Sequence, residues 1–259
     1  SLSGDMVGFW RTQTIGAAVE LGVIEALPAT EEDVAYRCGL SADGARRLLR
    51  ALGELNVAAR QGEHWTLTAK GELLRADHAL TLADAAVEYA GPFTAMWTRL
   101  PEALRSDTAW TGPDVFGDVA RDEVRCVGHH RMLRSYARHD YAEVCRALEL
   151  RGDERVIDAG GGLGVLAHLI AEAHPSAEVT ILERPEVVAM AAPESMVHWR
   201  SGSLFEPWEV AADSVVLSRV LHDWDDAMAL RILHHARAAL PRGGRLYVVE
   251  MLVPDEGVA

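Results

Sequence analysis

The sequence has no apolar run close to the ~18 residues that a membrane-spanning helix needs. Its first residues also lack the short apolar stretch of a secretory signal peptide. We therefore expect a cytoplasmic protein without a membrane partner. The chain starts at Ser1 and not at a methionine, so we expect its natural start to lie upstream.

Positive charge is also scarce. Lysine and arginine number 25 against 39 aspartates and glutamates, the formal net charge is −14, and no basic cluster stands out along the chain. A protein that binds nucleic acid needs a positive surface for the phosphates. We therefore expect no nucleic-acid partner.

Cysteine is rare, and the paired histidines lack the neighbours that a metal site needs. Cys38, Cys126 and Cys145 are widely spaced and fit neither a disulfide framework nor a zinc motif. Histidine pairs at 129–130 and 234–235 lie in helical stretches without acids at ligand spacing. We expect reduced thiols and no metal ion.

Helical spacing of apolar side chains dominates the first hundred residues or so. Thr30 and Ser41 are placed to cap two helices, the second of which is expected to end at Leu55. Residues 57–68 then put a polar turn between two strand-like pieces, and a further helix begins near Ala69. Two helices and a hairpin form a winged helix. Winged helices often bind DNA, but the acidic balance of the chain argues against that use.

Residues from about 80 to 148 also have a helical pattern. Trp97, Met132 and Tyr136 lie in this region at positions that suit either the wall of a pocket or a core. The pattern by itself does not choose between the two.

From Glu154 onward, short apolar runs alternate with helix-length segments. This alternation predicts an α/β domain of the Rossmann type, with a doubly wound, mainly parallel sheet. The expected elements, in chain order, are strand Arg155–Asp158, helix Gly164–Ala173, strand Glu178–Leu182, helix Pro185–Ala191, strand Met196–Arg200, strand Ser214–Ser218, helix Asp225–Leu240 and strand Arg245–Met251.

A glycine-rich loop stands where the first of these strands gives way to a helix. It follows Asp158 and contains Gly160 and Gly162, which allow positive φ and the close approach of a ligand to the backbone. The carboxylate ahead of the glycines, and a spacing that departs from GxGxxG, favour a cationic or hydroxylated ligand. Glu183 ends the next strand, where a carboxylate can accept hydrogen bonds from both ribose hydroxyls. That glutamate would serve NAD as well as S-adenosylmethionine.

One histidine is placed for chemistry. His222 follows the fourth strand, and ligands of open α/β sheets bind outside the carboxyl ends of the strands. Glu250 ends the next strand, so we expect its carboxylate beside the imidazole, where it fixes the tautomer that can take a proton from a hydroxyl. Asp225 is placed to cap the helix that follows.

These segments together resemble the small-molecule O-methyltransferase family, which includes plant caffeic acid methyltransferases and bacterial enzymes that modify aromatic polyketides. The resemblance extends from about Phe9 to the end of the chain. The motifs that carry it are Leu48-Leu49-Arg50-Ala51-Leu52, Leu67-Thr68-Ala69-Lys70-Gly71, Asp158-Ala159-Gly160-Gly161-Gly162, Leu182-Glu183-Arg184-Pro185 and Leu221-His222-Asp223-Trp224.

The resemblance implies an enzyme that transfers a methyl group from S-adenosylmethionine to a hydroxyl of a small aromatic molecule and leaves S-adenosylhomocysteine. It implies that His222 is the general base and that Glu250 flanks it. The expected cofactor-binding residues are Asp158, Gly160, Gly162, Glu183, Arg184, Ser203, Leu204, Ser218 and Arg219, and the expected substrate-binding residues are Trp97, Met132, Tyr136 and Asp223.

The resemblance also implies how the chain is divided. A winged-helix domain over residues 1–105 dimerises and closes the active site without touching DNA. A helical linker over residues 106–150 contributes to the active site, and a Rossmann-like domain over residues 151–259 binds the cofactor. We therefore expect a homodimer.

The sequence departs from the family pattern in two places and differs from the plant members in a third. Ser203 stands where the family usually has an aspartate at the adenine pocket, and Ser218 stands where plant members have a lysine, as in many bacterial members. The sequence also ends just after the fifth expected strand, whereas the family continues with a helix and two strands that carry a second glutamate beside the histidine. The resemblance implies either further chain beyond residue 259 or an incomplete enzyme.

Two alternatives stay open from the sequence. Relatives that methylate carbon or nitrogen, or that use the cofactor without methyl transfer, share these motifs, and a base beside a carboxylate favours a hydroxyl acceptor without deciding the matter. A regulatory or scaffold protein with a winged helix is of another class, and the presence of both His222 and Glu250 argues against it. The sequence does not identify the acceptor.

Overall fold

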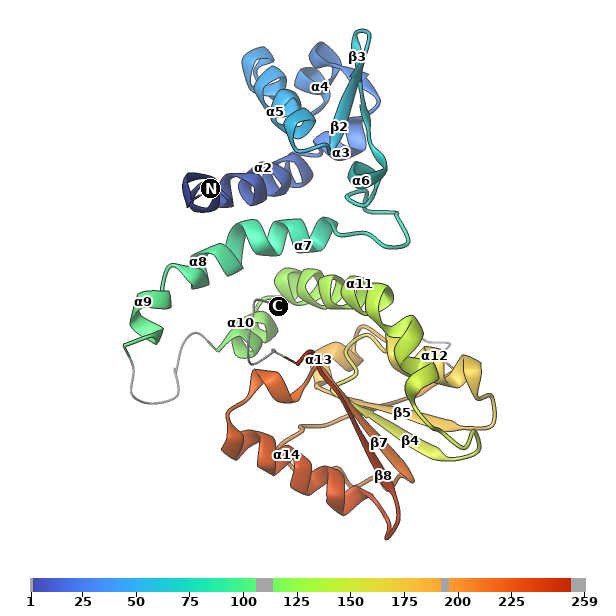
Figure 1. The fold of residues 1–259 in the computed structure, drawn as a ribbon. Helices are drawn as coiled ribbons and strands as arrows, with labels where there is room; N and C mark the ends of the chain where they lie inside the picture. Colours follow the sequence, from blue (N-terminus) through green and yellow to red (C-terminus); the bar gives the residue numbers. More distant parts are fainter. Residues whose placement is uncertain (1, 106–113, 192–195, 253–259) are drawn as a thin grey trace. The chain divides into compact units, whose positions relative to one another are not determined.

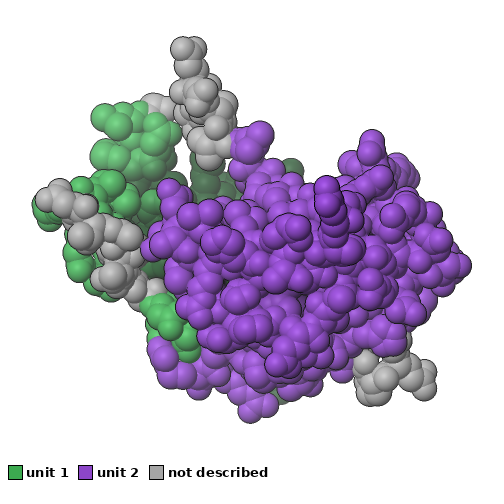
Figure 2. Space-filling model, turned by 90° about the horizontal axis from the view of Figure 1, so that it is seen from below, with its two compact units in different colours: residues 1–119 green, residues 120–259 purple. Residues whose placement is uncertain are grey.

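The chain divides into two structural units. The computed structural model describes residues 2–105, 114–191 and 196–252. The first unit extends to Val119 and the second begins at Ala120 (Figure 2). Within the described ranges, no helix has both the length and the apolar character to cross a membrane. The same residues contain no group of three or more His, Cys, Asp or Glu side chains that could hold a metal ion.

Short helices and a small sheet make up the first unit (Figure 1). Its elements are α1 Leu2–Met6, α2 Phe9–Glu20, α3 Val23–Ala26, β1 Ala29–Thr30, α4 Glu31–Arg37, α5 Ala42–Glu54, β2 Ala58–Gln61, β3 His64–Leu67, α6 Ala69–Glu72, α7 Ala83–Glu88, the π-helix η1 Tyr89–Phe93, α8 Thr94–Trp97 and α9 Leu100–Ala103. Helix α10, Val115–Arg121, spans the division between the units.

Local capping explains where α4 and α5 begin. The Thr30 hydroxyl accepts a hydrogen bond from the N–H of Asp33 at 3.1 Å, and the Asp33 carboxylate accepts one from the N–H of Thr30 at 3.4 Å, which forms a capping box. The Ser41 hydroxyl accepts a hydrogen bond from the N–H of Gly44 at 3.0 Å. Both expected helix starts are confirmed, and α5 ends at Glu54 rather than at Leu55.

The expected hairpin follows α5. Strands β2 and β3 pair antiparallel with Gln61 opposite His64, and Gly62 in the turn has the positive φ of 64° that a two-residue hairpin turn needs. Trp65 on β3 packs with Leu49 and Leu52 of α5 in one buried core. The winged helix expected from the sequence is therefore confirmed.

The second unit is a five-stranded parallel sheet with helices on both faces (Figure 1). Its elements are α11 Glu123–Ala147, β4 Arg155–Ala159, α12 Val165–Ala173, β5 Glu178–Glu183, α13 Pro185–Val188, β6 His198–Ser201, β7 Ser214–Ser218, the 3₁₀ helix η2 Leu221–Asp223, α14 Asp226–Ala239 and β8 Arg245–Val249. The strand order is β6-β5-β4-β7-β8, so the direction of winding reverses between β4 and β7. The doubly wound fold is confirmed, and ligands of such sheets bind at this reversal.

The expected linker over residues 106–150 is only partly described. Residues 106–113 lie outside the described residues, and α11 belongs to the second unit, where Tyr141, Val144 and Cys145 pack in the core beside α12. The long helix is therefore part of the structure that surrounds the sheet.

Element bounds differ from expectation near the carboxyl ends of the strands. Helix α13 ends at Val188 rather than at Ala191, and β8 ends at Val249 rather than at Met251. Strand β8 ends early because Glu250 turns its carboxylate toward the backbone N–H groups of Val220 and Leu221. The expected cap of α14 is confirmed, since Asp225 accepts a hydrogen bond from the N–H of Met228 at 2.8 Å.

The two faces of the sheet bury different helices. Ile157 and Val215 pack in a cluster with α14, whereas Val156 and Val216 pack in a cluster with α11 and α12. Because side chains alternate along a strand, Asp158 lies on the same face as Val156. The end of β4 therefore carries a carboxyl group on the face that α11 and α12 cover.

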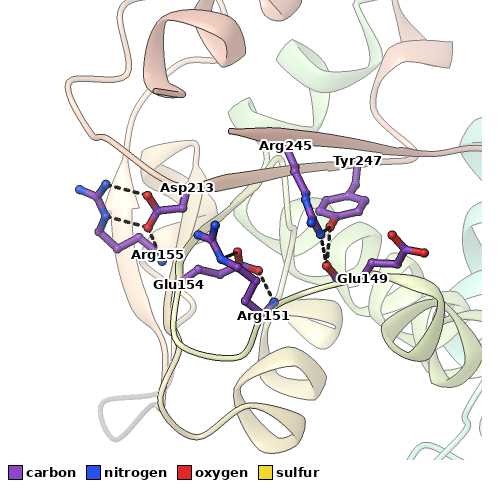
Figure 3. A network of polar contacts seen from close by, with 7 residues as sticks. All are labelled: Glu149, Arg151, Glu154, Arg155, Asp213, Arg245 and Tyr247. Carbon is purple, nitrogen blue, oxygen red and sulfur yellow. Dashed lines mark hydrogen bonds and ion pairs between the residues drawn. The ribbon is translucent and has the colours of Figure 1, made fainter. Parts of the chain in front are cut away.

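A network of polar contacts lies at the edge of the sheet where the strands begin, opposite their carboxyl ends (Figure 3). Arg155 donates hydrogen bonds from two nitrogens to the Asp213 carboxylate at 3.1 and 3.2 Å. The Tyr247 hydroxyl donates to the backbone oxygen of Glu149 at 3.0 Å. Glu154, itself buried, accepts a hydrogen bond from the N–H of Arg151 at 3.1 Å. The polar side chains at this edge therefore bind one another or nearby backbone atoms.

Candidate cofactor and catalytic site

The glycine loop leaves β4 by a series of left-handed turns. Gly160, Gly162 and Gly164 have φ of 75°, 56° and 79°, a region that glycine adopts far more readily than other residues. The N–H of Gly160 donates to the oxygen of Leu182 at 2.9 Å, which ties the start of the loop to β5. The loop then leads directly into α12.

The space around the loop differs between its glycines. A β-carbon at Gly160 would lie 2.9 Å from Cγ2 of Val220 and 3.4 Å from Cδ1 of Leu204. A β-carbon at Gly162 would meet no atom within 4 Å. Gly160 is therefore restricted by the protein's own packing, whereas Gly162 borders open space in which a ligand could approach the backbone.

Glu183 lies at the end of β5, next to the glycine loop. Its carboxylate accepts hydrogen bonds from the N–H of Gly162 at 3.3 Å and from the N–H of Arg184 at 2.6 Å. Burial raises the pKa of Glu183, and these two N–H groups oppose the rise. The carboxylate is therefore fixed in orientation beside the open side of Gly162.

Asp158 is the most isolated charge-bearing group of the site. Its side chain is 1% exposed, and neither carboxyl oxygen has a hydrogen-bond partner among the described residues. Burial, and secondarily the charge of Glu183, raise the pKa of Asp158 to about 7. The N–H of Ala167 opposes this rise, although it does not meet the geometry of a hydrogen bond.

Together these features select a class of ligand. A buried acceptor without a donor is stabilised by a cation or by hydrogen-bond donors. Neither carboxyl group offers positive charge to a pyrophosphate, so the loop suits a cationic, hydroxylated ligand better than a dinucleotide. The residues present therefore fit the ribose and the amino-acid group of S-adenosylmethionine.

The structure brings His222 and Glu250 together. Nδ1 of His222 lies 2.6 Å from Oε2 of Glu250. The other carboxylate oxygen accepts hydrogen bonds from the N–H groups of Val220 and Leu221 at 3.1 and 3.0 Å. One carboxylate thus fixes both the imidazole and the backbone turn that carries it. With Nδ1–H donated to Glu250, Nε2 of the neutral ring presents a lone pair.

Asp223 lies on the other side of the imidazole. Its Oδ1 is 3.4 Å from Nε2 of His222, close enough for an ion pair when the ring is protonated. Burial raises the pKa of Asp223, and the charge of His222 opposes that rise. A proton taken up by the imidazole would therefore be flanked by two carboxyl groups.

Other expected cofactor residues lie near the loop or bind elsewhere. A β-carbon at Gly160 would contact Leu204, which places Leu204 beside the loop. The Ser203 hydroxyl accepts a hydrogen bond from the N–H of Phe205 at 3.2 Å, and Arg184 forms an ion pair with Glu186.

Ser218 and Arg219 follow at the end of β7. Ser218 is buried, and Arg219 has a positive φ of 55° that is unusual for a residue with a side chain. The Arg219 guanidinium is paired with Asp140 of α11 at 2.9 Å. Both residues lie at the carboxyl end of β7, next to the point where the direction of winding reverses between β4 and β7.

The expected substrate residues do not all lie in one unit. Met132 is buried on α11, and Tyr136 lies one turn further along the same helix. Trp97 belongs to α8 of the first unit, where its side chain is 65% exposed. The sequence did not single out Tyr141, whose hydroxyl contacts Ser218. No local pattern marks a tyrosine that meets a residue 77 positions away.

The chain matches two family models. Residues 97–259 match an O-methyltransferase domain, and residues 5–77 match an O-methyltransferase dimerisation domain. A 3-amino-4-hydroxybenzoate 4-O-methyltransferase of Streptomyces cremeus is 32% identical, over 96% of this chain and 72% of that protein. A 3-hydroxy-5-methyl-1-naphthoate 3-O-methyltransferase of Streptomyces sahachiroi is 28% identical, over 96% of this chain and 76% of that protein.

A solved structure agrees with the sequence relatives. Human N-acetylserotonin methyltransferase in complex with S-adenosylmethionine superposes with a TM-score of 0.89 at 25% identity, over 98% of this chain and 80% of that chain. The similarity therefore covers both units of the chain.

The buried carboxyl of Asp158 predicts a pH-dependent stability of the ligand-free protein. Because its folded pKa is about 7 and its ordinary value is 3.8, the folded state holds a proton between these values that the unfolded state has lost. The contribution of this group to the free energy of unfolding should therefore fall as pH rises from about 4 to about 7, by up to about 1.4 kcal/mol per pH unit. Below about pH 4 both the folded and the unfolded state hold the proton, so the contribution of this group to the free energy of unfolding should no longer change with pH.

Asp158→Asn isolates this effect, since the amide is similar in shape and does not titrate. Urea denaturation of both proteins at pH 5 and pH 8 should show that the variant gains stability relative to the wild type at the higher pH. An equal difference at both pH values would mean that Asp158 is already ionised in the folded protein at pH 5.

Proposed function

The chain belongs to the O-methyltransferase family and is an S-adenosylmethionine-dependent enzyme, and we propose that it methylates a hydroxyl of a small aromatic molecule with His222 as general base. The observation that carries the proposal is the contact between His222 and Glu250 at the carboxyl edge of the sheet. Two family models and relatives that act on aromatic hydroxyls support it.

The relatives indicate the class of acceptor. The two bacterial relatives carry names that specify a hydroxybenzoate and a hydroxynaphthoate as substrates. Both are phenolic rings that also bear a carboxylate. We therefore propose a phenolic acceptor of one or two rings, formed in natural-product biosynthesis.

The chain's own residues would hold the methyl donor at the glycine loop. Glu183, fixed by two backbone N–H groups, is placed to accept hydrogen bonds from the ribose hydroxyls. Gly162 leaves room for close approach to the backbone. The Asp158 carboxyl, which has no hydrogen-bond partner in the described part of the chain, would bind a cationic group. When bound, S-adenosylmethionine supplies a methyl group that is already activated on a sulfonium.

His222 supplies the remaining requirement, which is removal of a proton. A phenol with a pKa near 10 is mostly protonated at neutral pH. Nε2 of His222 would take the proton of the acceptor hydroxyl as that oxygen is methylated. The resulting imidazolium lies between the carboxyl groups of Glu250 and Asp223, which stabilise its charge. Alignment of acceptor and donor supplies the rest of the rate.

The cofactor assignment predicts that a methyl group at Gly162 blocks binding. Gly162→Ala should weaken the affinity for S-adenosylmethionine about tenfold or more, since an intruding methyl in a filled site costs about 1–3 kcal/mol. Gly243→Ala is the matched control, because Gly243 also has a positive φ, of 86°, and a β-carbon added there would also meet no atom within 4 Å, but it lies in the turn before β8.

Isothermal titration calorimetry of the two variants and the wild type measures the difference. Both variants should lose similar stability, about 1–2 kcal/mol, from the left-handed backbone. Equal affinities of both variants for S-adenosylmethionine would show that Gly162 does not contact the cofactor.

The base assignment predicts a loss of turnover without a loss of cofactor. His222→Ala should lower turnover on the true acceptor by about 10² to 10⁴ and leave the affinity for S-adenosylmethionine nearly unchanged. Glu250→Gln should cost less, because the amide oxygen can still accept the N–H groups of Val220 and Leu221 while its charge is lost. His234→Ala, on the exposed side of α14, is the control.

Single-turnover rates with labelled cofactor measure these effects. Near-normal turnover of His222→Ala would show that His222 is not the base, and that the acceptor reacts either already ionised or through an atom other than a hydroxyl oxygen.

The first unit predicts self-association. Met6, Phe9 and Trp10 are large apolar residues with 66%, 55% and 60% of their surfaces exposed, and the segment matches a dimerisation domain. The protein should therefore be a homodimer by light scattering at micromolar concentration. Trp10→Glu should shift it toward monomer, whereas Leu230→Glu on α14 should not. A wild-type monomer would contradict the assignment.

A further inference from the structure

Helix α11 is joined to the end of β7 by two polar contacts in succession. The Ser218 hydroxyl donates a hydrogen bond to Oη of Tyr141 at 2.8 Å. The next residue, Arg219, forms an ion pair with Asp140 at 2.9 Å. Consecutive residues of the helix thus meet consecutive residues at the strand end, which fixes the Tyr141 hydroxyl at the carboxyl edge of the sheet.

The same edge carries Asp158, on the same face. Asp158 of β4 is in register with Val216 of β7, and Ser218 is two residues beyond Val216, so all three side chains project from one face. That is the face on which Tyr141 packs. Burial, and then the charge of Asp158, raise the pKa of Tyr141, as expected for groups close to each other. Two hydroxyls and a carboxyl therefore gather where β4 and β7 diverge.

The hydrogen-bonding capacity of this group is not used up. Ser218 donates to Tyr141, so the phenolic proton of Tyr141 remains to be donated. Both oxygens of Asp158 are buried and accept no hydrogen bond among the described residues. The group thus presents a donor beside a strong acceptor. An α-amino acid is complementary to that pair, because its carboxylate accepts and its ammonium donates.

We propose that Tyr141 is a cofactor-binding residue, which with Ser218 receives the carboxylate at the methionine end of S-adenosylmethionine while Asp158 receives the ammonium group. This inference rests on the proposed cofactor site, and it assigns the amino-acid end of the ligand to α11 and β7. The glycine loop and Glu183 hold the nucleoside end.

The test uses two ligands that differ at that end. S-adenosylmethionine carries the amino-acid group, and 5′-methylthioadenosine lacks it. Tyr141→Phe removes one oxygen atom and keeps the ring that packs against the core beside α12. The variant should bind S-adenosylmethionine about tenfold or more weakly and bind 5′-methylthioadenosine as the wild type does, because a hydrogen bond to a charged group is lost only with the first ligand.

Tyr247→Phe is the matched control. It also removes a hydrogen-bonded phenolic oxygen, but Tyr247 donates to Glu149 at the opposite edge of the sheet (Figure 3). Both ligands should bind this variant with wild-type affinity. Ser218→Ala tests the same group from the strand side, and it should reproduce the selective loss if Tyr141→Phe does not fold.

Calorimetric titration at one pH, with melting temperatures recorded alongside, separates the outcomes. Selective weakening of S-adenosylmethionine supports the assignment. Equal weakening of both ligands would overturn it, because Tyr141 would then only hold α11 in place, and so would unchanged affinity for both. If the wild type binds neither ligand, the proposed cofactor site fails before the role of Tyr141 is reached.

Discussion

The carboxyl group of Asp158 is held out of water at the point where β4 and β7 diverge, and the site is arranged around that unfavourable burial. Removing a carboxylate from water without a donor is costly, so the ligand-free protein favours the neutral form. The strands that impose this burial are themselves buried on both faces, so relaxation of the backbone would disrupt two cores. A bound cationic ligand would offset the burial, and occupation of the site would then stabilise the sheet.

The two edges of the sheet differ in how their charged side chains are paired. Where the strands begin, arginines and acids bind one another, as in the pair of Arg155 and Asp213. Where the strands end, the Asp158 carboxyl has no hydrogen-bond partner among the described residues, and backbone N–H groups hold Glu183. This asymmetry follows from parallel strands, since all carboxyl ends meet at one edge. One edge stabilises the sheet and the other remains available to a ligand.

Glu250 links the side chain of His222 to the backbone turn in front of it. One of its oxygens holds the imidazole of His222, and the other holds the N–H groups of the turn in front of that histidine. The imidazole of His222 and the turn that carries it are therefore held by the same carboxylate. Val220 in the same turn also limits the space at Gly160. The loop proposed to bind the cofactor and the turn that carries His222 are therefore packed close together.

The sequence by itself determined the features that depend on residues close together in the chain. The caps at Thr30, Ser41 and Asp225, the alternation of strands and helices after Glu154 and the glycine turn all depend on residues a few positions apart. Strand ends could also be placed at one edge, because a parallel sheet gathers them there. Only the tertiary structure decided what surrounds each side chain. The unpaired state of Asp158, the early end of β8 and the contact of Tyr141 with Ser218 depend on register and packing between segments far apart in the chain, which no local pattern of residues records.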